Sequence, residues 1–334
     1  MSHIIDVEDL VLIYADGTKA VDRISFDVQE GEVFGFLGPN GAGKSTVIKV
    51  LTTLLRKTSG KVVVVGHDVE HEAQQIRKLI GVEAQETVVD TDLTGIENVI
   101  LQGNLQGMRG TELSERAHEL LKLVELEAVA GKPAGRYSGG MKKRLQLACS
   151  LVHKPKLLFL DEPTTGLDPQ SRNGIWTYLE KLNKVDGITI FLTTQYLEEA
   201  DRLCQDLAII DAGKIVASGS PSGLKKQIGQ DTISLSIEGS LQDATLVERA
   251  RGIISRVRDV TQVLESDGGL VVQVNNASSI IADIVRGLDD SGIKLSSITF
   301  SSPTLDDVFL HHTGKRIRAE ELGKMPDRRI GWRR

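Results

Sequence analysis

The sequence predicts an α/β fold with a mainly parallel sheet, followed by a smaller α+β domain. Short apolar runs lie within EVFGFLG (32–38) and PKLLFLDEP (155–163), where glycine or acidic residues follow them, and segments with helical patterns separate the two. Buried parallel strands have this composition, because helices cover both faces of their sheet. The smaller domain is indicated by a change of pattern after about residue 229, where a different order of strands and helices begins.

The first domain opens with strand-like runs over 4–37, followed by a helical segment TVIKVLTTLL (46–55) and another strand, KVVVVG (61–66). Between Leu93 and Val129 apolar residues recur at intervals of three and four, which is typical of amphipathic helices. We therefore expect a helical subdomain at about 86–150.

Three further strands follow the helical segment and the apolar run at 155–163. They are GITIFLTT (187–194), LAIID (207–211) and KIVASG (214–219). Strands that alternate with helices predict parallel pairing with right-handed crossovers. A cluster of turn-forming residues at 218–229 suggests a domain boundary. We assign the first domain to 1–225.

The second domain has the order strand, helix, strand, strand, helix, strand, with a hairpin turning at Asp267-Gly268-Gly269. This βαββαβ order is the ferredoxin-like arrangement, which we assign to 231–313. Residues 315–334 carry eight basic and three acidic side chains, a net charge of +5. We expect the tail at 314–334 to be poorly ordered.

The bulk properties exclude several classes of protein. A net charge of −6 over 334 residues argues against general nucleic-acid binding. Two cysteines in apolar surroundings indicate small core residues in a reducing compartment. No apolar stretch approaches the roughly 18 residues of a membrane span, and the N-terminal segment lacks the basic start of a signal peptide. We expect a cytosolic chain.

A phosphate-binding loop follows the apolar strand that ends at Leu37. GPNGAGKST matches the P-loop pattern G-x-x-x-x-G-K-[ST] between a strand and a helix, which is the context that validates it. Lys44 should reach the β- and γ-phosphates, and the Ser45 hydroxyl should bind Mg²⁺. The residues expected to bind ATP in this loop are Gly38, Pro39, Asn40, Gly41, Ala42, Gly43, Lys44, Ser45 and Thr46.

The second half of the predicted site is an acidic pair at the end of a buried strand. Leu157–Leu160 are apolar, and Asp161 follows them where a metal ligand is expected. Glu162 comes next and can act as the general base that polarises an attacking water. The chain is therefore expected to be a P-loop NTPase that uses ATP and Mg²⁺.

A second glycine-containing loop, YSGGMKKR (137–144), precedes another helix and predicts a second anion-binding helix N-terminus. The chain thus has two candidate phosphate-binding loops but one P-loop lysine and one Asp-Glu pair. A two-fold homodimer resolves this mismatch if Ser138, Gly139 and Gly140 of each copy bind the nucleotide of the other. A flexible glycine turn remains the alternative interpretation of this loop.

These motifs, in this order, resemble the nucleotide-binding subunit of ATP-binding cassette (ABC) transporters over residues 4–225. The resemblance implies that Tyr14 stacks on adenine, that Gln85 in GVEAQE reaches Mg²⁺ and senses the membrane partner, and that Asp168 in TGLDP lies at the dimer interface. YSGGM departs from the LSGGQ signature of the family at both ends.

A narrower resemblance rests on YSGGM, TTQYLEEAD and the terminal PTLDDVFL. Together they are similar to the daunorubicin-resistance group of export ATPases, in which the membrane part is a separate permease chain. The resemblance implies a peripheral subunit at the cytoplasmic face of the membrane, which contacts the membrane through its permease. The helical segment after Gln85 is expected to touch that permease.

Gln195 stands where the family usually carries a histidine. Its amide offers two N–H donors and one carbonyl acceptor, so it can bind a γ-phosphate and orient water without a charge. Glutamine orients the attacking water in small GTPases. Because Lys44, Asp161 and Glu162 are all present, we expect a working ATPase with Glu162 and Gln195 as catalytic residues.

Two other functions are compatible with part of the pattern. One is a soluble ABC-type ATPase that acts on a macromolecular partner, for which the basic tail gives some support. However, Lys44 and Ser138 are too close in sequence for the long coiled coil of the DNA-repair branch, and there is one P-loop where the translation-factor branch has two cassettes. The other is a small-molecule P-loop kinase, which the Ser-Gly-Gly loop and Gln85 disfavour.

Overall fold

The computed structural model describes residues 3–84, 89–238, 245–266 and 269–314. The chain divides into two compact units, one ending at Pro221 and the other spanning Ser222–Gly314. The expected tail at 315–334 lies outside the described residues, and the domain limits of 225 and 231 stay predictions.

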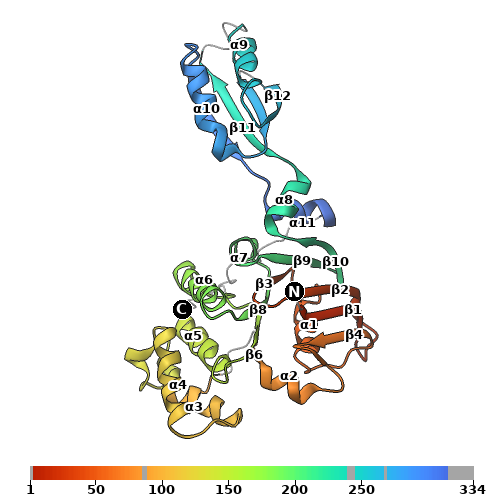
Figure 1. Cartoon of the computed structure of the whole chain (residues 1–334), viewed down its shortest axis with the longest axis vertical. Coiled ribbons are helices and arrows are strands. Elements are labelled where there is room, and N and C mark those ends of the chain that lie inside the picture. The colour runs from red at the N-terminus through yellow and green to blue at the C-terminus, as the bar shows by residue number, and fades with distance from the viewer. Residues whose placement is uncertain (1–2, 85–88, 239–244, 267–268, 315–334) are drawn as a thin grey trace, which may run out of the picture. The chain divides into compact units, whose positions relative to one another are not determined.

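Two sheets form the first unit and confirm the predicted α/β class (Figure 1). The larger sheet has the order β10-β9-β3-β8-β7-β6, and within it the strands from β9 to β6 pair in parallel. Its strands are β3 (Val33–Leu37), β6 (Ile80–Glu83), β7 (Leu157–Asp161), β8 (Thr189–Thr194), β9 (Asp206–Asp211) and β10 (Lys214–Gly219). Every residue of β3, β7 and β8 is buried, as their apolar composition predicts.

The first strands of the chain form a separate antiparallel sheet, β2-β1-β4-β5. It contains β1 (His3–Ile13), β2 (Lys19–Gln29), β4 (Ser59–Val64) and β5 (His67–Asp68). The buried residues of β2 are Val21, Ile24 and Val28, which belong to the core; they do not follow a regular alternation, because the pairing of β2 with β1 has several register shifts. Phe26 on this strand stacks on Phe34 of β3, with 5.7 Å between ring centroids, and so packs this sheet against the parallel one.

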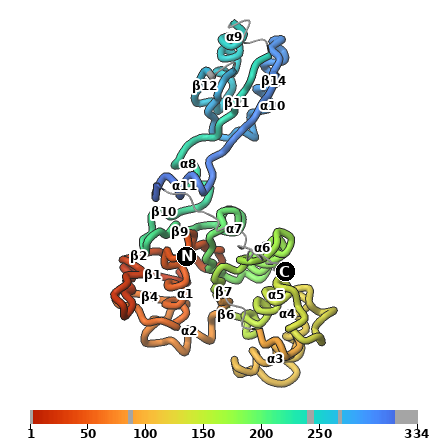
Figure 2. Tube along the Cα trace, turned by 180° about the vertical axis from the view of Figure 1, so that it is seen from behind, coloured from red at the N-terminus to blue at the C-terminus, as the bar shows by residue number. Residues whose placement is uncertain are grey.

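The helices of the first unit begin at clear sequence signals. Thr94 and Glu97 form a capping box at the start of α3, and Asp168 caps α6 just before Pro169. The helices are α1 (Lys44–Leu51), α2 (Ala73–Leu79), α3 (Gly95–Leu105), α4 (Gly110–Leu123), α5 (Gly139–Ser150), α6 (Pro169–Lys184) and α7 (Leu197–Leu203). Helices α3, α4 and α5 pack against one another at the end of the unit away from β1 and β4 (Figure 2).

The second unit has the predicted βαββαβ order. Its strands form one antiparallel sheet, β12-β13-β11-β14, the spatial order of a ferredoxin-like domain. Its elements are α8 (Pro221–Ile228), β11 (Asp231–Ile237), α9 (Thr245–Ile254), β12 (Val260–Ser266), β13 (Gly269–Val274), α10 (Ala277–Asp289), β14 (Leu295–Ser301) and α11 (Leu305–Thr313). Ile233, Val272 and Ile284 belong to a core that the sheet shares with α9 and α10.

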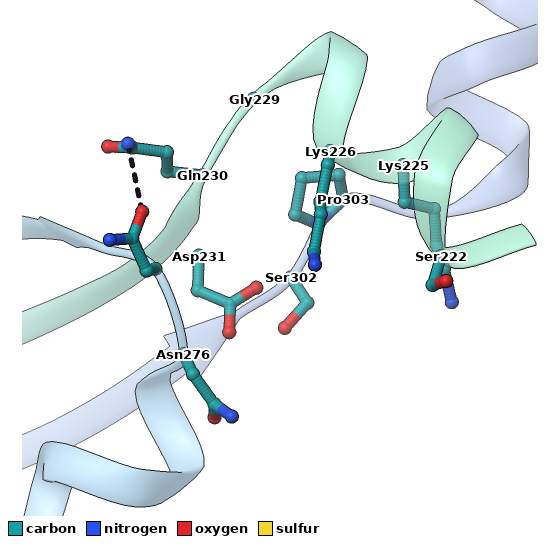
Figure 3. A pocket seen from close by; sticks show the side chains of 10 residues that line it. Ser222, Lys225, Lys226, Gly229, Gln230, Asp231, Asn276, Ser302 and Pro303 are labelled. Carbon is teal, nitrogen blue, oxygen red and sulfur yellow. Dashed lines mark hydrogen bonds between the residues drawn. The ribbon is translucent and has the colours of Figure 1, made fainter. Parts of the chain in front are cut away.

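A cavity of about 500 Å³ opens in this second unit where α8, β11, β14 and the start of α10 meet (Figure 3). Several of its polar groups hold these elements together. The Asp231 carboxylate accepts a hydrogen bond of 2.9 Å from the backbone N–H of Ala277 at the start of α10. The Gln230 side chain donates to the Asn275 side chain at 3.3 Å (Figure 3).

Candidate functional site

The loop between β3 and α1 borders a cavity of about 610 Å³, within the size range of ligand pockets. Gly43 has φ +107°, and a Cβ there would lie 2.6 Å from the carbonyl oxygen of Ala20, so only glycine fits without movement. The cavity is lined by Tyr14, Thr18, Lys19, Ala20, Asn40, Gly41, Gly43, Lys44, Ser45, Thr46, Glu162, Ala212 and Gly213. Most of the predicted P-loop residues therefore surround one space.

The remaining three residues of the predicted loop do not line the cavity, but their hydrogen bonds hold the loop in place. Gly38 and Pro39 offer their carbonyl oxygens to the Lys44 ammonium, at 2.8 and 3.0 Å. Ala42 is buried, and its carbonyl oxygen accepts a 3.0 Å hydrogen bond from the backbone N–H of Gly213 in the turn between β9 and β10. The loop is thus fixed both to its own lysine and to a distant turn.

Lys44 is a buried cation at the start of α1. Its ammonium nitrogen lies 3.2 Å from a carboxylate oxygen of Glu162, and each side chain is 4% exposed. Burial lowers the pKa of Lys44, and the negative charges of Glu162 and Asp161 oppose that shift. A buried cation at the N-terminus of a helix is a suitable anchor for an anionic ligand.

Asp161, the last residue of β7, accepts hydrogen bonds from two hydroxyl groups. The Ser45 hydroxyl donates to its carboxylate at 3.1 Å, and the Thr193 hydroxyl of β8 donates to the same oxygen at 2.5 Å. A carboxylate with a serine hydroxyl is an oxygen donor set that fits a hard divalent cation such as Mg²⁺. The third predicted metal ligand, Gln85, lies outside the described residues.

Glu162 has a backbone conformation that is rare for glutamate, with φ +52°. Such a left-handed residue costs about 1–3 kcal/mol and persists where its surroundings hold it. Its backbone N–H donates to the carbonyl and hydroxyl oxygens of Thr193, both at 3.1 Å, and the Thr165 hydroxyl donates to its carboxylate at 3.1 Å. This turn after β7 directs the carboxylate into the cavity, beside Lys44.

Tyr14 and Gln195, which the sequence also assigned to the site, differ in their position. Tyr14 lines the cavity with a partly exposed ring, and its hydroxyl shares a 2.9 Å hydrogen bond with the Thr46 hydroxyl. Gln195 follows β8 directly and is half-buried, but it is not among the residues that line the cavity. The structure therefore brings Tyr14 to the P-loop and leaves the contact of Gln195 with a phosphate as a prediction.

Ser138, Gly139 and Gly140 lie at the start of α5 and do not line the P-loop cavity of their own chain. Ser138 caps the helix by accepting a 3.3 Å hydrogen bond from the backbone N–H of Met141, and both Ser138 and Gly139 are exposed. Gly140 packs closely against α6, since a Cβ on it would lie 2.7 Å from the Ser171 hydroxyl.

Asp168 lies at the N-terminus of α6, the helix against which Gly140 packs. Its carboxylate accepts hydrogen bonds from the backbone N–H groups of Gln170 and Ser171, at 3.1 and 3.0 Å. The Ser171 side chain first, and then the backbone N–H groups of Ser171 and Gln170, lower the pKa of Asp168 through hydrogen bonds to its carboxylate. Asp168 and the Ser-Gly-Gly loop therefore both border Ser171.

Tyr137, the first departure from the signature sequence, has a structural role. Its ring is buried, and its hydroxyl donates a 2.7 Å hydrogen bond to the carbonyl oxygen of Val129. The neighbouring residue on α3 has to be small, because a Cβ on Gly95 would lie 2.3 Å from that hydroxyl. The tyrosine thus anchors the exposed loop to the helical subdomain.

Sequence reasoning missed several residues of the site. Thr193 holds both members of the acidic pair, yet in the sequence it is one of two threonines at the end of an apolar strand. Ala212 and Gly213 come from a turn about 170 residues after the P-loop. Periodicity and motif spacing carry no signal for such contacts between distant segments.

Two family models match the chain. The model described as ABC transporter matches residues 21–165, and the model described as the C-terminal domain of DrrA1-3-like ATP-binding proteins matches residues 219–313. The first covers the P-loop, the Ser-Gly-Gly loop and the acidic pair. The second covers nearly all of the second unit.

Curated relatives extend over most of the chain. The daunorubicin/doxorubicin resistance ATP-binding protein DrrA of Streptomyces peucetius is 41% identical over 93% of this chain and 92% of its own length. The linearmycin resistance ATP-binding protein LnrL of Bacillus subtilis is 36% identical over 91% and 97%. The Nod factor export ATP-binding protein I of Sinorhizobium fredii is 39% identical over 89% and 82%.

Solved structures resemble a large part of the chain. An ATP-binding cassette captured as a dimer in a post-hydrolysis state with ADP and Pi has a TM-score of 0.60 and 28% identity, over 65% of this chain and 98% of that one. The structure of cbiO1 from Clostridium perfringens, part of the ABC transporter complex cbiONQ, has a TM-score of 0.63 and 26% identity, over 77% and 97%.

Proposed function

The chain belongs to the ABC transporter family as an ATP-binding, ATP-hydrolysing subunit, and on that premise we propose that it powers the export of a drug-like or hydrophobic compound through a separate membrane permease. Its relatives include proteins named for resistance to daunorubicin, doxorubicin and linearmycin and for export of Nod factors. None of the helices in the described parts of the chain is long and apolar enough to span a membrane. We place the subunit at the cytoplasmic face, bound to its permease.

One observation carries this proposal: the P-loop cavity is lined by Lys44, Tyr14 and Glu162 of the chain but by no residue of the Ser-Gly-Gly loop. Lys44 is proposed to bind phosphate oxygens, Tyr14 to stack on the base, and Glu162, which lies beside Lys44, to polarise an attacking water. Ser138 and Gly139 are exposed elsewhere on the same chain. A second copy, packed head to tail, brings these residues to the open side of the nucleotide.

The donor set at Asp161 and Ser45 supports a Mg²⁺ ion bound with the nucleotide. When bound, the ion would neutralise charge on the phosphate oxygens. The residues of the chain would do the rest: Thr193 keeps the Asp161 carboxylate in place and holds the backbone turn at Glu162. Glu162 would accept a proton from water, and Gln195 is proposed to orient that water or the γ-phosphate.

Transport would follow from closure of the dimer on ATP and its opening after hydrolysis, with the helical segment after Gln85 passing the motion to the permease. The alternative of a soluble ATPase that acts on a macromolecular partner finds no support among the relatives, which carry names of resistance and export.

The proposal is tested by co-expressing the full chain with its permease and measuring ATP hydrolysis and drug efflux together. Glu162→Gln should abolish both, because the general base contributes about 10²–10⁴-fold in rate. An exposed carboxylate on α7 provides the control, since Glu198→Gln should leave both activities intact. Efflux that continues at the full rate with Glu162→Gln would exclude the proposed coupling.

A further inference from the structure

A buried ion pair joins helix α5, which follows the Ser-Gly-Gly loop, to strand β6. The Lys143 ammonium nitrogen lies 3.5 Å from a carboxylate oxygen of Glu83, and the two side chains are 7% and 3% exposed. Lys143 is five residues beyond Ser138, and Glu83 is the last residue of β6. Charged residues are almost never buried in this way unless they are paired, so the pairing offsets part of the cost of burying both charges.

Two further contacts hold the same helix against the same strand. The Gln146 side chain donates a 3.0 Å hydrogen bond to the carbonyl oxygen of Ala84, next to Glu83. Farther along, a Cβ on Gly81 would lie 2.4 Å from the carbonyl oxygen of Ser150, so helix and strand approach closely there as well. Helix α5 is therefore fixed to β6 along its length, with the ion pair nearest the Ser-Gly-Gly loop.

Strand β6 in turn lies beside the strand that carries the acidic pair. Glu83 is in register with Leu160 of β7, and Asp161 and Glu162 follow immediately. Helix α5, β6 and β7 thus connect two functional groups of one chain: Ser138–Gly140 at one end and Asp161-Glu162 at the other. Burial raises the pKa of the Glu83 carboxyl, the Lys143 ammonium opposes this rise, and the buried Glu199 on α7 adds to it.

We propose that Glu83 and Lys143 are positioning residues that couple the two nucleotide sites of the dimer. The inference rests on the proposed function, in which each chain uses Asp161 and Glu162 at its own nucleotide and Ser138–Gly140 at the nucleotide of the partner. Because the ion pair links these groups within one chain, a displacement of β7 at the chain's own nucleotide moves the Ser-Gly-Gly loop at the nucleotide of the partner. Neither Glu83 nor Lys143 lines the P-loop cavity, so the pair acts through the residues it positions.

The test measures steady-state ATP hydrolysis by the purified full chain as a function of ATP concentration. Two coupled sites predict a Hill coefficient above 1 and at most 2 for the unchanged chain. In Lys143→Met and Glu83→Gln we expect it to fall to 1, with kcat about 10-fold lower. Affinity of each chain for ATP, measured with a fluorescent analogue, should stay within about twofold because the P-loop is untouched.

Two more variants separate positioning from folding. Lys143→Arg keeps the charge and should retain the Hill coefficient. The double variant Glu83→Gln/Lys143→Gln leaves no unpaired charge, so we expect it to fold with a melting temperature near that of the unchanged chain and still to lose cooperativity. The matched control is the ion pair Lys57–Glu70, at 2.7 Å in the same unit, where Lys57→Met should change nothing.

The inference is overturned by a Hill coefficient of 1 in the unchanged chain, by cooperativity that persists in the folded double variant, or by an equal loss in Lys57→Met. Failure of the proposed function would give a different experimental result. If Glu162→Gln stays monomeric with saturating ATP, the nucleotide-sandwich dimer itself is wrong. If that dimer forms and the Glu83 and Lys143 variants keep their cooperativity, only the inference about the ion pair falls.

Discussion

The ammonium nitrogen of Lys44 lies 3.2 Å from the carboxylate of Glu162, so the expected phosphate ligand and the expected general base are direct partners. The same nitrogen donates to the carbonyl oxygens of Gly38 and Pro39. Phosphate oxygens of ATP compete with Glu162 for this cation. Nucleotide binding is therefore expected to release the carboxylate where an attacking water has to be polarised.

Lys44→Ala should weaken ATP binding by about 10- to 100-fold, which corresponds to the 1.5–3 kcal/mol of a hydrogen bond to a charged group. The variant also removes the cation beside the buried carboxylate of Glu162, so the negative charge of Glu162 adds repulsion toward the phosphates. Titration with a fluorescent ATP analogue measures the change. Lys49→Ala, on the exposed side of the same helix, is the control, and affinities within threefold of each other for the two variants would contradict the assigned role.

Gln195→Ala should lower kcat for ATP hydrolysis by about 10-fold or more, since an oriented donor and acceptor are lost near the reacting water. Gln195→His should retain most of the activity, because imidazole also supplies one donor and one acceptor. ATP affinity should change little in either variant. Unchanged turnover in Gln195→Ala would remove Gln195 from the catalytic residues.

Gly95→Ala should lower the free energy of unfolding by about 1–3 kcal/mol, as overpacking does, because the new Cβ would meet the Tyr137 hydroxyl at 2.3 Å. Tyr137→Phe removes that hydroxyl and its hydrogen bond to Val129. In a double-mutant cycle by denaturant unfolding, the double variant should be more stable than the sum of the single effects by at least about 0.5 kcal/mol. Strictly additive effects would show that the two residues do not clash.

Glu199 on α7 predicts how the stability of the fold depends on pH. Burial raises its pKa above the usual 4.5, although hydrogen bonds donated to its carboxylate by Thr164, at 2.7 Å, and Trp176, at 2.9 Å, oppose the shift. A raised folded-state pKa means that the folded chain binds the proton more tightly. The contribution of Glu199 to stability is therefore fully present below about pH 4.5 and declines as the pH rises through the folded-state value.

Glu199→Gln should accordingly gain stability relative to the unchanged chain as the pH increases from 4.5 to 8. Calorimetric melting of the full chain at several pH values measures this difference. The exposed neighbour Glu198 supplies the control, and Glu198→Gln should show a flat difference over the same range. A difference for Glu199→Gln that shrinks with rising pH would reverse the sign of the argument.

The sequence predicted the parts of the fold in which local signals are strong. Apolar strands ending at Leu37 and Asp161 located the central parallel sheet, and the βαββαβ order of the second unit is confirmed. The separate antiparallel sheet of β1, β2 and β4 was not expected, because runs of strand residues do not state which strands pair. That choice depends on contacts such as Phe26 with Phe34.

For the site, the motifs identified groups but not how they are held. A P-loop and an acidic pair can be read from residue order, whereas the ion pair of Lys44 with Glu162 and the hydrogen bond of Thr193 to Asp161 depend on three-dimensional packing. Backbone strain at Glu162 is equally invisible in the sequence, since φ +52° is unusual for this residue type. Gln85 lies outside the described residues, so its role rests on the resemblance to the family.

The central claim is that two copies close on ATP and that each supplies its Ser-Gly-Gly loop to the nucleotide of the other. A structure of the full chain carrying Glu162→Gln, prepared with ATP and Mg²⁺, tests it most directly. We predict a two-fold dimer in which the γ-phosphate contacts Lys44 of one protomer and Ser138 of the partner subunit. A closed, ATP-bound form in which one chain alone surrounds the triphosphate would contradict the account.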